Sequence, residues 1–191
     1  MIETAAVRVA LSLLHLPSAI RRVKAEPLPA GVDVLLQVVA GDAAVQREAA
    51  TRTERPVDMI REAAEFFVEQ ILLAPESGSY RILGAAAEAP ASELRHNMAL
   101  LLRWLHPDKM QTDDRRALVE RVTLAWENLK TPERRASYDR QQQGQRQPSK
   151  ASGRRHRSQN MTGPPTVGHN HRTRNGKPSL LRRALYLLLG R

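Results

Sequence analysis

Apolar residues recur at helical spacing in several stretches of the chain, and proline and polar residues separate these stretches. The spacing predicts one helix over 4–16, a second beginning after Asp42 and a third beginning at Pro56. Asp42 suits a helix cap, Pro56 suits a first helical turn, and Pro75 ends the third helix. We therefore expect residues 1–76 to form a small helical module with a structural role.

Two longer apolar stripes follow and enclose a short polar loop. Pro90 suits the first turn of one helix, and Pro107 ends it because proline has no N–H and its ring clashes with the preceding turn. Two such stripes favour an antiparallel helical hairpin. Thr131 and Pro132 then fit the cap and first position of a further helix. The stripes consist of Leu94, Met98, Leu101, Leu102 and Leu105 in the first helix and of Val119, Val122, Ala125, Trp126 and Leu129 in the second.

The composition supports an all-α fold. Hydrophobic residues make up 41% of the chain but aromatic residues only 4%, so the clusters that favour strands are scarce. Residues 141–179 begin with a glutamine-rich run and have almost no large apolar side chains, which predicts a disordered basic linker because no core can form. Residues 180–191 regain leucine at helical spacing and predict a short amphipathic helix.

The net charge of +10 is a property of the C-terminal part. Residues 1–139 hold 18 Lys and Arg and 20 Asp and Glu, a net charge of −2, whereas residues 140–191 hold 12 Lys and Arg and no acidic residue. Cysteine is absent, which excludes disulfides and thiolate metal sites. The N-terminus lacks the basic region of a secretory signal, so we expect a cytoplasmic protein.

The tripeptide His106-Pro107-Asp108 occupies the hairpin loop. Proline stiffens this corner, the Asp108 carboxylate offers two acceptor oxygens to an arginine on a partner, and the His106 imidazole can donate or accept near neutral pH. The alternative is that the loop only caps the hairpin, with Asp108 satisfying local N–H groups.

The hairpin and its flanks resemble the J-domain family over residues 79–140. His106-Pro107-Asp108-Lys109 is similar to the signature of the family, and Tyr80-Arg81-Ile82-Leu83-Gly84 is similar to its opening turn. Further resemblance lies in Ala125-Trp126-Glu127-Asn128-Leu129 and in Pro132-Glu133-Arg134-Arg135-Ala136-Ser137-Tyr138-Asp139. Order, spacing and helical context agree with the family across about a third of the chain.

The resemblance implies a co-chaperone that docks on a DnaK-type chaperone and stimulates its ATP hydrolysis. His106, Pro107, Asp108 and Lys109 would then contact the chaperone, joined by the basic residues Arg95 and Arg103 on the preceding helix. ATP belongs to the partner, so the chain needs no cofactor. The resemblance does not identify the client protein.

The chain does not resemble an enzyme or a metal protein. A metal site at His106 would need further ligands, and His96 lies ten residues earlier on another part of its helix. No carboxylate pair, nucleophile or glycine-rich phosphate loop appears by spacing.

The helix before the loop departs from the family pattern. Leu100 and Trp104 occupy outward positions four residues apart, where J domains usually present basic residues. One hypothesis is that part of residues 1–74 packs over these side chains, which would weaken or regulate docking. The other is that both side chains are half-exposed.

A second function stays open: a J-like scaffold without stimulation, recruited through its basic tail to an anionic membrane or to nucleic acid. Residues 180–191 are too short to span a bilayer but suit a peripheral membrane contact. Nucleic acid is the weaker of these two partners, because residues 140–178 contain no aromatic side chain on which bases can stack.

Overall fold

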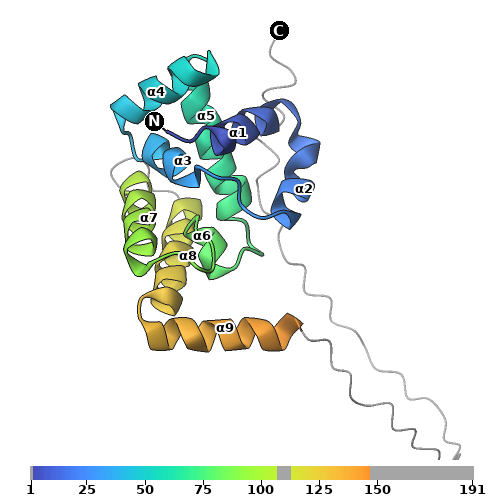
Figure 1. The fold of residues 1–191 in the computed structure, drawn as a ribbon, viewed down its shortest axis with the longest axis vertical. Helices are drawn as coiled ribbons and strands as arrows, with labels where there is room; N and C mark the ends of the chain where they lie inside the picture. The colour runs from blue at the N-terminus through green and yellow to red at the C-terminus, as the bar shows by residue number, and fades with distance from the viewer. Residues whose placement is uncertain (1, 107–112, 147–191) are drawn as a thin grey trace, which may run out of the picture. The chain divides into compact units, whose positions relative to one another are not determined.

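The computed structural model describes residues 2–106 and 113–146, whose regular elements are all helical (Figure 1). The all-α prediction is confirmed. The first 76 residues contain α1 (Ala5–His15), the 3-10 turn η1 (Pro17–Ala19), α2 (Ile20–Ala25), α3 (Val32–Val39), α4 (Ala43–Thr53), α5 (Val57–Phe67) and the π-helical turn η2 (Val68–Leu72).

Local sequence signals fix several of these boundaries. The Asp42 side chain accepts hydrogen bonds from the backbone N–H groups of Ala44 and Val45, at 2.9 and 3.1 Å, and so caps α4 as its position predicts. Pro56 lies one position before α5 and has the extended backbone of a cap residue, so the first helical residue is Val57. The last turn of the α5 stripe widens into a π-helical turn, which the apolar spacing does not reveal.

The remaining elements are α6 (Ser79–Ile82), α7 (Ala91–Trp104), α8 (Asp113–Leu129) and α9 (Pro132–Arg146). α7 and α8 pack against each other as a hairpin, and α9 turns away across the end of α8 (Figure 1). α9 continues to Arg146, so the first six residues of the segment 141–179, expected to be disordered, are helical instead. Residues 147–179 and the helix expected over 180–191 lie outside the described residues.

The N-terminal helices and the hairpin share one hydrophobic core. α1 and α3 pack on α5, while α3 also packs on α7, so that a single cluster of buried apolar side chains runs from Ala6 to Leu129. Burial of this continuous apolar surface is the main force that stabilises the fold.

Gly84 marks the closest approach between the two segments. Its φ of +62° lies in the left-handed region, and a Cβ at this position would come within 2.9 Å of Val32 Cγ1 and 3.2 Å of Leu36 Cδ1 on α3. Glycine is therefore required here both for its backbone conformation and for the space. The turn after α6 thus fits closely against α3.

Polar contacts join the same two segments. Arg81 of α6 donates to the backbone oxygen of Glu26, and Arg121 of α8 donates to the backbone oxygen of Leu73. Burial lowers the pKa of Arg81. These contacts and the shared core hold α6 to α8 against the N-terminal helices.

Trp104 points inward, which corrects the outward placement expected from the hairpin alone. Its side chain is only 3% exposed, and Leu100 is half-buried against the core. The reason is that α7 has two neighbours, α8 and α3, and therefore buries a wider stripe than a simple hairpin requires. Within the described part of the chain, none of the helices is long and apolar enough to cross a bilayer.

Candidate functional site

The loop between α7 and α8 is closed at its base by Trp104 and Arg115. Arg115 Nη1 donates a hydrogen bond of 3.1 Å to the backbone oxygen of Trp104, and its guanidinium carbon lies 5.3 Å from the centre of the indole ring. A guanidinium at this distance over a tryptophan face gains a cation–π attraction. One arginine therefore ties the last residue of α7 to the first turn of α8.

The loop residues singled out by the sequence lie beyond this closure. His106, two residues after the end of α7, is exposed. Pro107, Asp108 and Lys109 lie outside the described residues. The structure thus positions the two ends of the loop and the exposed His106 at its start.

α7 presents a basic face next to the loop. Arg95, Ala99 and Arg103 follow one another at four-residue intervals, and all three are exposed together with the adjacent His96. Residues four apart share one face of a helix, and no acidic residue interrupts this one. The cover that α3 provides lies on the buried side of α7, so Arg95 and Arg103 stay accessible. Arg95 and Arg103 are thus exposed although Trp104 on the same helix is buried.

Arg95 also reaches across to the neighbouring helix. Its guanidinium carbon lies 6.0 Å from the centre of the Trp126 ring on α8, at the outer limit of a cation–π contact. The contact of the Arg115 guanidinium with Trp104 is shorter, at 5.3 Å.

Asn97 fixes α7 to the turn that precedes it. This side chain is 1% exposed, and its Nδ2 donates a 3.0 Å hydrogen bond to the backbone oxygen of Leu83. The Oδ1 atom has no hydrogen-bond partner among the described residues. A buried amide is costly unless it is bonded, so the bond to Leu83 partly offsets the burial and fixes the rotation of α7.

A second network holds α9 against α6. The hydroxyl of Tyr80 donates to Asp139 at 2.9 Å and accepts from Arg135 Nε at 2.9 Å. Arg135 also donates to the backbone oxygens of Ala89 and Ala87. Burial, followed by the hydrogen bond to Asp139, raises the pKa of Tyr80 above its usual value. The network joins the beginning of the segment 79–140 to its end.

Ser79 completes this junction. Its backbone N–H donates to the hydroxyl of Tyr138 at 2.7 Å, and its Oγ accepts from Asn128 Nδ2 at 3.0 Å. The Tyr80 and Tyr138 rings meet edge to face with centroids 5.8 Å apart, a favoured aromatic geometry. α6, α8 and α9 are thereby fastened at one point.

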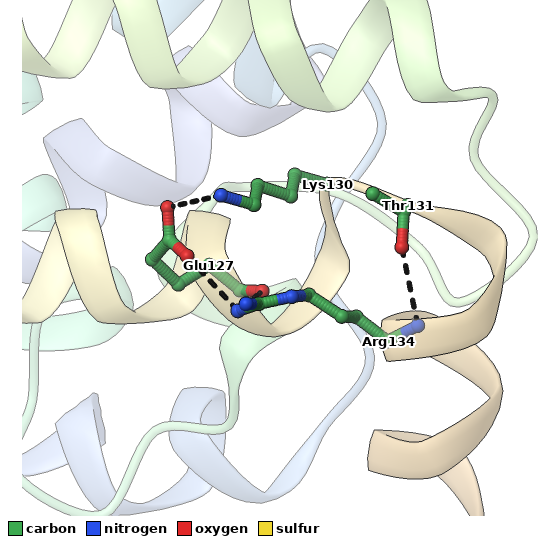
Figure 2. A network of polar contacts seen from close by, with 4 residues as sticks. All are labelled: Glu127, Lys130, Thr131 and Arg134. Carbon is green, nitrogen blue, oxygen red and sulfur yellow. Dashed lines mark hydrogen bonds and ion pairs between the residues drawn. The ribbon is translucent and has the colours of Figure 1, made fainter.

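The corner between α8 and α9 is stabilised by a smaller polar cluster (Figure 2). Glu127 accepts from Lys130 Nζ at 2.7 Å and from Arg134 Nη1 at 2.9 Å, and Thr131 caps α9 through a 3.3 Å bond from the Arg134 backbone N–H. Lys130 and then Arg134 lower the pKa of Glu127. The Thr131 cap and Pro132 at the first helical position are as the sequence predicts.

Three residues that hold the helices of this segment together were not predicted from the sequence. Arg115, Asn97 and Arg135 act through partners 11 to 55 residues away, and no local spacing marks such pairs. One signal was available for Asn97: a polar residue within the apolar face formed by Leu94 and Leu101 indicates a buried hydrogen bond.

No group of three or more His, Cys, Asp or Glu side chains in residues 2–106 and 113–146 is placed to hold a metal ion. The exposed polar groups on this side of the described residues are the imidazole of His106 and the guanidinium groups of Arg95 and Arg103.

Comparison with known families agrees with this geometry. Residues 78–139 match the family model of the DnaJ domain. That match covers about a third of the chain and spans α6 to the first half of α9. No curated protein and no solved structure shows a significant match.

Residues 78–139 therefore belong to the J-domain family, as their resemblance predicts. J domains in general are partners of DnaK-type chaperones and are not themselves enzymes.

Proposed function

We propose that this protein is a co-chaperone that docks on a DnaK-type chaperone through its J domain and stimulates ATP hydrolysis there. The observation that carries the proposal is the match of residues 78–139, whose sequence contains His106-Pro107-Asp108-Lys109 between the paired helices α7 and α8.

Stimulation requires that the loop bind one conformation of the chaperone better than another, because a ligand shifts only an equilibrium whose states it binds differently. Asp108 carries most weight in this interaction. Its carboxylate suits a bidentate contact with a guanidinium, and removal of one partner of a desolvated charge pair typically costs about 2–5 kcal/mol.

Arg95 and Arg103 steer the encounter, and Lys109 extends their positive charge into the loop. Exposed charges of one sign raise the association rate with an oppositely charged surface more than they raise the final affinity. The partner surface is therefore acidic. The adjacent His106 is proposed to contact the chaperone directly.

Each segment of the chain has its own proposed role. Residues 79–140 act on the chaperone, and residues 1–76 support them through the shared core. Residues 141–179 serve as a basic linker and residues 180–191 as an amphipathic helix. ATP hydrolysis takes place in the partner, so the chain itself acts without a cofactor and without a catalytic residue.

A second candidate is a J-like scaffold that does not stimulate hydrolysis and is recruited by its basic tail to an anionic membrane or nucleic acid. The concentration of 12 Lys and Arg and no acidic residue in residues 140–191 favours it. We place the protein in the cytoplasm, with peripheral membrane contact through residues 180–191 as part of this second candidate.

One experiment distinguishes the co-chaperone from the scaffold: the steady-state ATP turnover of a purified DnaK-type chaperone is measured with and without the full-length protein. Saturable stimulation supports the co-chaperone. Salt-sensitive binding to anionic vesicles or DNA without stimulation supports the scaffold.

A further inference from the structure

A groove lies between the end of α1 and the end of α4, in the N-terminal segment and away from the hairpin loop. Its volume is about 560 Å³. Arg8, Leu11 and His15 line it at helical spacing along α1, and Leu16 continues it past the helix end. Arg52 of α4 and Arg55, two residues past the end of that helix, also line it. The groove therefore combines leucine side chains with guanidinium groups.

The apolar part of the groove is open to water. Leu16 is 60% exposed, one of two large apolar side chains with such exposure among the residues that the structure describes. Leu11 beside it is half-buried. Burial of an exposed leucine in a groove by an apolar side chain of a partner favours binding, because apolar surface is removed from water.

The guanidinium groups of Arg8 and Arg55 are available to a ligand. Both residues are exposed, and neither side chain makes a hydrogen bond or ion pair with another described residue. Arg52 is partly engaged, because it pairs with Glu48 at 3.0 Å. Glu54 is the one acidic side chain in the lining.

We propose that this groove binds an acidic, leucine-bearing segment of a partner protein, in the manner of an amphipathic helix that places carboxylates on Arg8 and Arg55 and apolar side chains on Leu11 and Leu16. Charge complementarity selects this occupant. The chain's own segment 180–191 is leucine-rich but contains Arg182, Arg183 and Arg191 and no acidic residue, so it is repelled.

Other anionic partners fit the groove less well. It contains no aromatic side chain on which a nucleic-acid base can stack. A bilayer surface is met by protruding side chains, whereas Leu11 and the two arginines line a hollow. The proposal concerns a face separate from the J-domain loop and does not depend on the proposed stimulation of a chaperone.

The test uses the full-length protein and a short fluorescent synthetic peptide in which leucine recurs at helical spacing among glutamates. Fluorescence anisotropy at physiological salt gives its dissociation constant. The double variant Arg8→Glu/Arg55→Glu is expected to weaken binding on the order of tenfold or more, because two attractive charges become repulsive. Leu16→Ser is expected to weaken it on the order of threefold.

Arg47→Glu is the matched control. Arg47 is an exposed arginine of α4 outside the groove, so the same change of charge there should leave binding unchanged. A peptide with lysine in place of glutamate should not bind. Circular dichroism of all variants confirms that the helices are retained.

Three results would overturn the proposal. Equal binding by the double variant would place the peptide on the basic tail. Binding that appears only after removal of residues 180–191 would make that segment the occupant. Displacement of the acidic peptide from the groove by anionic vesicles or RNA, at lower concentration than by unlabelled peptide, would assign the groove to lipid or nucleic acid.

Discussion

Arg115 and Trp104 meet at the two ends of the loop that carries His106, Pro107 and Asp108. The 3.1 Å hydrogen bond and the 5.3 Å distance from the guanidinium carbon to the centre of the indole ring show that one side chain joins the two ends of the loop, in addition to the packing of α7 on α8. Because a loop can present a fixed surface only if its ends are fixed, this pair links the packing of the hairpin to the proposed activity.

The Arg115→Met variant tests that link. Methionine retains much of the volume but loses the hydrogen bond and the cation–π contact, which together account for about 1–2 kcal/mol. Urea unfolding should show a loss of this size, and stimulation of a DnaK-type chaperone should fall severalfold at protein concentrations where the variant is still folded.

The control for this prediction is Arg116→Met, since Arg116 is an exposed neighbour on α8 without a bond to α7. Equal stimulation by wild type and Arg115→Met would show that the loop does not need this closure.

Tyr80→Phe tests the fastening of α9. The variant keeps the ring and its contact with Tyr138 but removes the hydroxyl that Asp139 and Arg135 share. We expect the free energy of unfolding to fall by about 1–2 kcal/mol, because two charged groups lose a partner.

Hydrogen exchange shows whether Tyr80→Phe destabilises only the helices joined by the network or the whole fold. Faster exchange should concentrate in α9 and α6, with α1 and α5 unchanged. Uniform loss of protection across all helices would contradict a local role of the network.

Glu127 gives a pH dependence with a definite sign. Its pKa is lowered below 4.5 in the folded protein, chiefly by the hydrogen bond from Lys130. The folded state therefore binds the proton less readily than the unfolded state. The stabilisation is complete above the unfolded value of about 4.5 and is lost as the pH falls through the lower folded value.

The Glu127→Gln variant should accordingly be slightly less stable than wild type at neutral pH, and the difference should shrink as the pH falls below 4.5. Urea midpoints at several pH values measure it. Glu120→Gln is the control, because Glu120 is exposed on α8 and forms no ion pair with a described residue. A difference that stays constant with pH would rule out the ion-pair origin.

Arg103→Glu tests the basic face of α7. Arg103 is exposed, so the variant should fold with unchanged stability. The concentration of protein needed for half-maximal chaperone stimulation should rise on the order of tenfold, and added salt should reduce the difference because it screens exposed charges. Arg47→Glu on α4 supplies the same change of charge elsewhere and should behave as wild type.

The sequence predicts the helices well where proline and capping residues mark their ends. Asp42, Pro107 and the pair Thr131-Pro132 each carry a local steric or hydrogen-bonding reason to begin or end a helix, and that reason does not depend on the rest of the fold. The resemblance located the J domain for the same reason, since its motifs lie in one continuous segment.

What the sequence did not predict depends on contacts between distant segments. The sequence left open whether part of residues 1–74 covers Trp104 or whether Trp104 is half-exposed; its burial, in a helix that packs on α3 as well as on α8, favours the first hypothesis. Arg135 reaches Tyr80 across 55 residues. The groove of Arg8 and Arg55 likewise combines two helices whose pairing no local pattern specifies.

The central claim is that the loop of the J domain stimulates ATP hydrolysis by a DnaK-type chaperone through Asp108. The most direct measurement is the single-turnover rate of ATP hydrolysis by that chaperone with wild-type protein, with Asp108→Asn, and with Asp33→Asn as an exposed control on α3. The account predicts stimulation by wild type and Asp33→Asn and almost none by Asp108→Asn, with all three equally helical. Undiminished stimulation by Asp108→Asn, or none by wild type, would contradict it.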